Sequence, residues 1–569
     1  MARYAGVLFV VLVALASCTP VAQPRAGERA VPDAISAPAG PKIITIAQQG
    51  PKEGFAPWFI GGPPGPLQWE ELHSNFLVSA DAFGTAEPLL AEKLPSLGDR
   101  TIEVLPDGRM RTTWKLRPNI KWHDGQPFTT DDLVFGWEVQ THPEVPTSSS
   151  ASVRAIQSIE VIDPQTMAIN FRTPSLRVLE MGYRDLYPLP RHLLGQAFGG
   201  PKEPFTALPY WSTEYVHTGP FRMREFQLGE QMTFERFDDY YLGRPKVDRV
   251  VIRIIPDNSA VVSNLLAGAV DVAGELPTDM AVRLRDQWQQ SSGGSVISRQ
   301  AFWRFVSIQF HPEWGGPPEV QQDVRARRGL AHAIDTEALR TAVVPGFPDT
   351  VGDTFMLKGD PRASVVGTPF ARYRYDPSAA TAELAEAGLR RGGDGRILNA
   401  AGQQVRLNLR APTGDLETEL AAVARNWREL GFEVGEEVTP APLRRDNEYN
   451  VKFPGGEVTA QGPEFWRRFD SRQRPTAENR YTGTNAGNYA NPAFDRLIDR
   501  VLVSLDDNEI AVILKDMGEV LAADLPALPL YFAVRTIVTL QHVRGLDDIH
   551  GAPGRLGTTA KNAYLWDRS

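Results

Sequence analysis

Residues 114–138, WKLRPNIKWHDGQPFTTDDLVFGWE, carry several local folding signals in a fixed order. The apolar positions predict two short strands joined by a turn. Asp124 and Gly125 form a tight-turn dipeptide, because glycine readily takes a positive φ. Thr129 then predicts the N-cap of a helix, with Asp132 in its first turn, where a carboxylate suits the positive end of the helix dipole. None of these signals requires a catalytic group.

The same stretch resembles the signature of the family 5 extracellular solute-binding proteins, the receptors of oligopeptide, dipeptide and nickel ABC importers. Later segments resemble that family in the same order, namely LLAGAVDV at 265–272, DVRARRGLAHAID at 323–335 and NYANPAFDRLI at 488–498. The resemblance implies an α/β, two-lobe periplasmic-binding-protein fold of type II, cluster C, with mixed sheets and a two-strand hinge. Gly329 departs from the family pattern and costs about 1 kcal/mol of helix propensity relative to alanine.

The N-terminus predicts export and a lipid anchor. The nine-residue apolar run VLFVVLVAL at 7–15 follows a positive charge and is too short to span a bilayer, so we expect a signal peptide over 1–17. The run ends in LASC, which resembles a bacterial lipobox and implies lipidation of Cys18, the chain's only cysteine. The alternative is an ordinary signal peptide that ends near a cysteine. Proline-rich residues 18–41 lack core-forming side chains and predict a disordered tether.

Composition predicts a folded globular body with more than one core. The chain has 569 residues, 42% apolar and 23% charged, which is too long for one ordinary core. We expect lobe I at 42–304 with an extra subdomain, lobe II at 305–534, and a return to lobe I at 535–569. The net charge is −9 and the basic residues are scattered, which argues against a nucleic-acid partner. Nothing like a heptad repeat appears, so we expect a monomer.

One side of the expected ligand cleft departs from well-known peptide-binding relatives. In those relatives a Trp-x-x-Asp element follows a strand of the second lobe, and its aspartate pairs with the amino terminus of the peptide. Here the corresponding strand is expected at 449–453, and it is followed by Gly455, Gly456 and Glu457 without Trp-x-x-Asp in register. Glu457 is a candidate replacement anion for a cationic ligand; the alternative is a solvated loop glutamate.

Other candidate ligand contacts are aromatic, amide and arginine side chains. Trp466 can stack on a ring or peptide plane, and Arg467, next to Arg468, can clamp a carboxylate or phosphate. The alternative is a surface loop whose arginines pair with Asp470 or Glu464. The remaining candidates offer a ring or neutral hydrogen bonds, and they are Trp303, Asn485 and Tyr489.

Enzyme signatures are missing from the sequence. His123 and Asp124 form a turn rather than a metal motif, because the nine histidines show no HExxH or paired spacing. No G-x-S-x-G elbow appears, and the prolines in GGPPG at 61–65 remove amide donors that a phosphate cradle needs. We therefore expect no catalysis and no cofactor.

The favoured interpretation is an extracytoplasmic receptor, anchored in the membrane through Cys18, that delivers a peptide or similar oligomer to an ABC permease and ATPase complex. Receptors for a sugar-like ligand or a metal chelate, and receptors with a signalling or chaperone-like role, stay as alternatives. An exported hydrolase is the last alternative.

Overall fold

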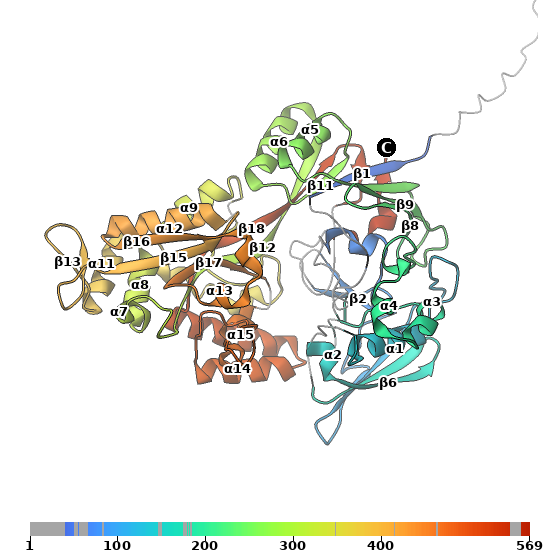
Figure 1. Cartoon of the computed structure of the whole chain (residues 1–569), viewed down its shortest axis with the longest axis horizontal. Helices are drawn as coiled ribbons and strands as arrows, with labels where there is room; N and C mark the ends of the chain where they lie inside the picture. Colours follow the sequence, from blue (N-terminus) through green and yellow to red (C-terminus); the bar gives the residue numbers. More distant parts are fainter. Residues whose placement is uncertain are drawn as a thin grey trace, which may run out of the picture. The chain divides into compact units, whose positions relative to one another are not determined.

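The computed structural model describes residues 40–49, 55, 67–81, 85–145, 151–174, 179, 181–182, 185–347, 349–414, 416–462, 465–546 and 559–569. Ten strands join one mixed sheet in the order β16-β15-β17-β12-β18-β11-β1-β10-β9-β8 (Figure 1). These strands are β1 (Ile43–Gln48), β8 (Phe221–Gln227), β9 (Gln231–Arg236), β10 (Arg249–Ile254), β11 (Val272–Gly274), β12 (Gly294–Ile308), β15 (Arg406–Pro412), β16 (Glu433–Thr439), β17 (Gly456–Gln461) and β18 (Ala527–Leu540).

The two longest strands, β12 and β18, pair with each other along their whole length and carry different neighbours at each end. At one end β11 pairs with β18 around Val538, and at the other end β17 pairs with β12 from Trp303 to Ile308. The β12–β18 register shifts on either side of Trp303, between Gln300 and Phe302 and between Arg304 and Phe305. A pair of strands therefore connects two groups of secondary structure.

The group beyond Trp303 has its own hydrophobic core, here called the C-terminal core, which extends in sequence from Trp303 to Ala533. In its β15-α12-β16 unit a helix connects two neighbouring parallel strands, β15 and β16. The helices of this group are α8 (Val324–His332), α9 (Thr336–Val343), α11 (Pro377–Glu386), α12 (Leu416–Leu430), α14 (Pro492–Val503) and α15 (Asp507–Asp524).

Helix α8 crosses α11 at Gly329. A Cβ atom at Gly329 would lie 2.8 Å from Cγ of Leu384 and 3.0 Å from the carbonyl oxygen of Ala380. Glycine thus permits a close approach of the two helices, which explains the departure from the family pattern at this position.

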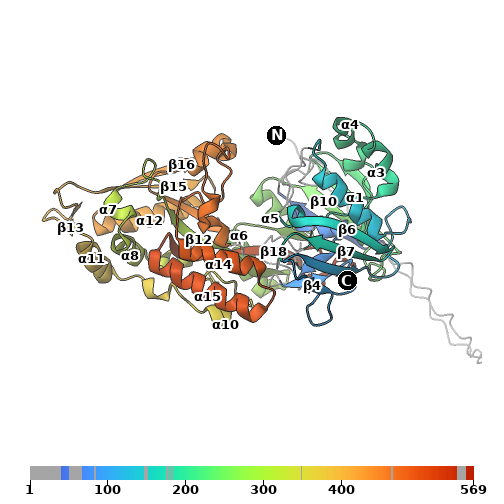
Figure 2. The same cartoon turned by 90° about the horizontal axis from the view of Figure 1, so that it is seen from below.

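Three further clusters of buried residues are here called the N-terminal cores, and two of them include residues from the other end of β12 and β18. Ile537 and Trp566, from the end of the chain, pack in the same cluster as Ile44 of β1. A four-stranded sheet, ordered β4-β5-β7-β6, covers another cluster (Figure 2). The strands of this sheet are β4 (Ile102–Val104), β5 (Met110–Lys115), β6 (Ile156–Asp163) and β7 (Thr166–Phe171). The longer helices in this part of the chain are α1 (Thr130–Thr141), α3 (Arg191–Phe198), α5 (Asn258–Leu266) and α6 (Thr278–Ser291).

The stretch 114–138 folds largely as predicted. Gly125 takes φ +88° in the tight turn, and α1 begins directly after Thr129, whose backbone N–H donates to the Asp132 carboxylate over 2.9 Å. The prediction of a second strand was wrong, because only an isolated bridge between Lys121 and Pro127 forms around the turn.

The remaining elements are short. They are β2 (Val78–Ala80), β3 (Ala86–Pro88), β13 (Arg390–Arg391), β14 (Ile397–Leu398), β19 (Val543–Arg544), β20 (Asp567–Arg568), α2 (Ala151–Ala155), α4 (Lys202–Thr206), α7 (Pro318–Gln321), α10 (Ala363–Val366), α13 (Asn447–Val451) and the 3-10 turn η7 (Phe465–Phe469). Within the described ranges, no helix combines the length and apolar character needed to cross a membrane.

Candidate functional site

The candidate site lies where β12 passes from the N-terminal cores to the C-terminal core. Val296 and Ile297 of β12 pack against N-terminal cores, whereas Trp303 belongs to the C-terminal core. Gln461, the last residue of β17, lies directly opposite Trp303 in the β12–β17 register. We call Trp303, Gln461, Trp466 and Arg468 the crossing-strand site, because they gather at this passage.

Trp303 contributes a buried aromatic ring and an indole N–H to the site. Its side chain is 1% exposed, and its ring lies 4.6 Å from the ring of Phe305 and 5.4 Å from that of Phe370, measured between centroids. The indole Nε1 is buried and has no hydrogen-bond partner among the described residues. Such an unsatisfied donor is uncommon in folded proteins.

The 3-10 turn η7 presents Trp466 and Arg468 beside the end of β17. Arg468 donates from Nε to Oε1 of Gln461 over 2.9 Å, and its guanidinium lies 5.9 Å from the centre of the Phe305 ring. Burial lowers the pKa of Arg468 from its ordinary value, and the negative charge of Glu457 partly opposes this shift. In the described part of the chain, Nε1 of Trp466 and Nη1 of Arg468 are buried without a hydrogen-bond partner.

Glu457 lies in a buried strand and not in the predicted loop. Residues 447–451 form helix α13 rather than a strand, because Asp446 caps the helix by accepting from the N–H of Tyr449. The strand is instead β17, and it places Glu457 in the interior, where its carboxylate accepts from Nη2 of Arg410 over 2.8 Å. The prediction of strand 449–453 was therefore wrong, and so was the alternative of a solvated glutamate.

The two glycines before Glu457 allow a close backbone passage. Gly455 takes φ +71°, and a Cβ atom there would lie 2.7 Å from the carbonyl oxygen of Asn408. At Gly456 a Cβ would lie 3.1 Å from Leu409. These positions thus shape the start of β17, and their contact with a ligand stays a prediction.

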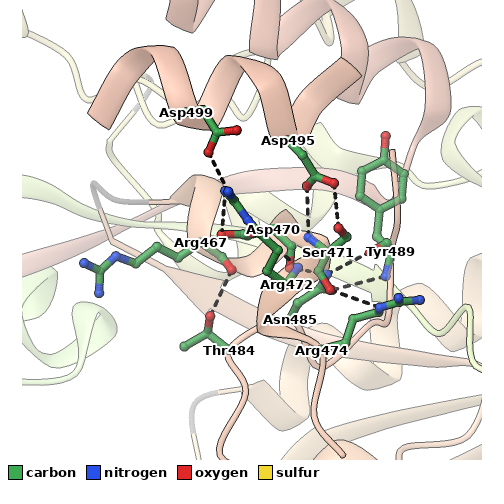
Figure 3. A network of polar contacts seen from close by, with 10 residues as sticks. All are labelled: Arg467, Asp470, Ser471, Arg472, Arg474, Thr484, Asn485, Tyr489, Asp495 and Asp499. Carbon is green, nitrogen blue, oxygen red and sulfur yellow. Dashed lines mark hydrogen bonds and ion pairs between the residues drawn. The ribbon is translucent and has the colours of Figure 1, made fainter. Parts of the chain in front are cut away.

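Asn485 and Tyr489 hold two loops together (Figure 3). The Asn485 amide donates to the carbonyl oxygens of Asp470 and Tyr489 over 2.9 and 2.8 Å, and it accepts from the Tyr489 N–H over 3.1 Å. The Tyr489 hydroxyl donates to Asp524 over 2.5 Å, and burial raises the pKa of this phenol. Both residues therefore have a structural role, and their direct contact with a ligand is untested.

The predicted pairing of Arg467 or Arg468 with Asp470 does not occur. Asp470 accepts instead from Nε of Arg472 over 2.8 Å, and Figure 3 shows the Arg467 guanidinium pointing away from this carboxylate. The Arg467 carbonyl oxygen accepts from the hydroxyl of Thr484 over 2.9 Å. The sequence did not distinguish Arg468 from Arg467, since adjacent arginines in a turn differ only in their direction.

The described part of the chain offers no cluster of metal ligands. No group of three or more His, Cys, Asp or Glu side chains is placed there to hold a metal ion. His123 is buried in the predicted turn and bonds to the carbonyl oxygen of Gly219 over 2.9 Å. Cys18 and residues 61–65 lie outside the described residues.

Comparison with known families gives one extended match. The family model described as "Bacterial extracellular solute-binding proteins, family 5 Middle" matches residues 85–465, well over half of the chain. This range contains two residues of the crossing-strand site, Trp303 and Gln461, and it ends just before Trp466 and Arg468.

Curated relatives agree with the family match. A Brucella ovis protein, named as an ABC transporter peptide-binding protein, is 27% identical over 309 residues, which are 53% of this chain and 54% of that protein. The chain thus spans about half the length of this relative. The oligopeptide-binding protein AppA of Bacillus subtilis is 23% identical over 84% of this chain and 83% of its own length.

Solved structures show the same fold over nearly the whole chain. NikA from Brucella suis, solved in complex with Fe(III)-EDTA, superposes with a TM-score of 0.72 at 20% identity and covers 93% of this chain and 100% of its own.

Proposed function

Because this chain belongs to family 5 of the bacterial extracellular solute-binding proteins, we propose that it binds a solute outside the cytoplasm and delivers it to the permease and ATPase of an ABC importer. The predicted type II periplasmic-binding-protein fold is confirmed by the structural match. Membership of a receptor family also confirms the prediction that the chain is not an enzyme.

The observation that carries the proposal is the long pair β12 and β18, whose two ends belong to different cores. Such a pair can bend while the cores stay rigid, so solute binding can favour closure. We assign lobe I to 42–304 and 535–569, and lobe II to 305–534. The free energy of closure comes only from contacts that the solute makes better in the closed state.

A peptide is the proposed class of solute. Support comes from the two relatives, whose names give peptide or oligopeptide binding. We place the solute at the crossing-strand site, where buried donors of Trp303, Trp466 and Arg468 have no partner among the described residues. Glu457 is an unsuitable anchor for the peptide amine, because its carboxylate is already bound by Arg410.

Native purification tests this proposal. The chain from residue 19 onward, without Cys18, is purified without denaturant, and small molecules released on denaturation are identified by mass spectrometry. Protein stripped in denaturant and refolded serves as the control. A set of peptides that raises the melting temperature of the stripped protein further at each higher concentration supports the proposal, since stabilisation grows with the logarithm of ligand concentration and reaches about 2.7 kcal/mol at 100 times Kd. Recovery of one non-peptide compound contradicts the peptide class and leaves the receptor function in place.

The membrane anchor is a separate proposal. We propose that the chain is cut before Cys18 and carries diacylglycerol on this cysteine, so that the receptor stays at the outer face of a membrane. Full-length protein should then partition into detergent and incorporate labelled fatty acid, and Cys18→Ala should abolish both properties. Wild-type protein that stays in the aqueous phase and carries no labelled fatty acid would contradict the proposed lipid anchor.

A further inference from the structure

We propose that Arg468 is the specificity-determining residue of the crossing-strand site and that it selects solutes carrying a carboxylate group. The carboxylate would accept hydrogen bonds from the Nη atoms of Arg468, next to the indole N–H of Trp466. This inference rests on the proposed receptor function and defines the chemistry of the solute more narrowly.

The first argument is the lack of a counter-ion. Among the described residues, Arg468 makes one hydrogen bond, to the neutral amide of Gln461. Glu457 attracts the guanidinium, but its carboxylate bonds to Arg410, and Asp470 bonds to Arg472. Within the described residues, no carboxylate lies within ion-pair distance of Arg468. Buried charges in proteins are normally paired, so an anion from outside the chain would complete this site.

The second argument is the orientation of the guanidinium. The bond from Nε to Gln461 and the position over the Phe305 ring fix one edge of the group. The Nη edge is thereby left for another partner, and Nη1 is buried without one among the described residues. This edge offers two parallel N–H donors, whose spacing matches the two oxygens of a carboxylate.

The third argument is the character of the neighbouring groups. Nε1 of Trp303 and Nε1 of Trp466 are also buried without a partner in the described part of the chain, and both can only donate. The Trp466 ring is held against Phe465, with 5.5 Å between centroids, and Trp303 lies opposite Gln461. The unpartnered atoms of the site, Nε1 of both tryptophans and Nη1 of Arg468, are all donors, so they favour a solute that offers acceptors, as a carboxylate or a peptide carbonyl group does.

The test compares acidic and neutral forms of the same probe. Tetra-alanine with a free C-terminal carboxylate and tetra-alanine amide are titrated into stripped wild-type protein by calorimetry, and the retained solute is tested as extracted and as its methyl ester. The variants are Arg468→Gln and Arg467→Gln. Arg474→Gln is the matched control, because Arg474 is an exposed arginine six residues away. Glu464→Gln tests a carboxylate four residues before Arg468, which lies outside the described residues.

We expect wild-type protein to bind the free carboxylate form about 10 to 100 times more tightly than its neutral form, as expected for a hydrogen bond to a charged group. Arg468→Gln should remove this preference and leave the affinity for the neutral form unchanged. Arg474→Gln and Glu464→Gln should keep the preference. Melting curves show that each variant is folded.

Equal affinity of wild-type protein for both forms overturns the proposal, as does an unchanged preference in Arg468→Gln or a loss of preference in Arg467→Gln alone. If tetra-alanine does not bind at all, the retained solute and its ester decide the outcome in the same way. A retained solute without an anionic group overturns the role of Arg468 and leaves the receptor function standing. The two proposals can therefore fail separately.

Discussion

Glu457→Gln should destabilise the C-terminal core, because it removes the charge that compensates Arg410. Arg410 is 1% exposed and donates to Glu457 over 2.8 Å and to the carbonyl oxygen of Tyr449 over 2.9 Å. Glutamine keeps the shape and one acceptor but leaves the guanidinium without a negative partner. Breaking a buried ion pair costs about 3–5 kcal/mol; since glutamine keeps a hydrogen bond, we expect about 3 kcal/mol.

The assay is urea denaturation at pH 7.5, followed by tryptophan fluorescence and circular dichroism so that a separate transition of the C-terminal core is recognised. Glu433→Gln is the matched control, because Glu433 pairs with Arg406 over 3.1 Å across neighbouring strands, with both side chains about half exposed. Such a pair contributes about 0–1 kcal/mol. The double variant Arg410→Leu/Glu457→Leu should recover part of the loss, limited by the carbonyl group of Tyr449 that it leaves without a donor.

The competing interpretation makes the opposite prediction. If Glu457 holds a cationic solute, Glu457→Gln lowers solute affinity and leaves the free energy of unfolding within about 0.5 kcal/mol of wild type, as for an ordinary surface substitution. That result would refute the assignment of Glu457 to the interior. A loss equal to that of Glu433→Gln would refute it as well.

Three further substitutions test other parts of the structure. Gly329→Ala should destabilise the protein by about 1 kcal/mol or more in urea denaturation. The added Cβ would lie 2.8 Å from Leu384, and such overpacking costs about 1–3 kcal/mol, which exceeds the gain in helix propensity. A stabilised variant would contradict the close crossing of α8 and α11. Burial lowers the pKa of His123 to about 4, below its ordinary value of 6.5, and the neutral ring accepts from the His217 N–H over 3.2 Å. As the pH falls, His123 therefore takes up a proton in the unfolded chain before it does so in the folded protein. The contribution of this residue to the free energy of unfolding is complete above pH 6.5, and about 3 kcal/mol of it is lost by about pH 4. His123→Gln should remove that part of the pH dependence in chemical denaturation, and an unchanged dependence of the free energy of unfolding on pH would contradict the assignment. Arg468→Met should raise the free energy of unfolding of solute-free protein by about 1 kcal/mol, because it removes a buried cation without a counter-ion, and a decrease would indicate a structural partner.

Local signals in the sequence predicted the elements whose ends have caps. Asp376 before Pro377 and Asn491 before Pro492 are such signals, and each accepts backbone N–H groups at the start of α11 and α14. At 447–451 the β-branched and aromatic residues indicate a strand, but the cap at Asp446 begins a helix there instead. These decisions depend on residues within one helical turn, and a sequence can in principle supply them.

The sequence alone did not predict contacts between residues on distant elements. Glu457 meets Arg410 only because β15 and β17 are neighbours in the sheet, and Gly329 is needed only because α11 crosses α8 there. The choice between Arg467 and Arg468 likewise depends on how η7 turns against the end of β17. Neither hydrophobic periodicity nor a family motif contains this information, because adjacent arginines have the same chemistry.

The position of Arg468 gives the receptor a way to couple solute chemistry to closure. A carboxylate bound by Arg468 contributes about 1.5–3 kcal/mol if the contact is complete only when both lobes enclose the solute. That difference shifts the equilibrium between open and closed states by about tenfold to a hundredfold, whereas a solute that binds equally well in both states shifts nothing. Because β12 carries Trp303 at its passage between the cores, the charge that selects the solute lies next to the strands that must bend. Recognition and closure would then depend on the same contact.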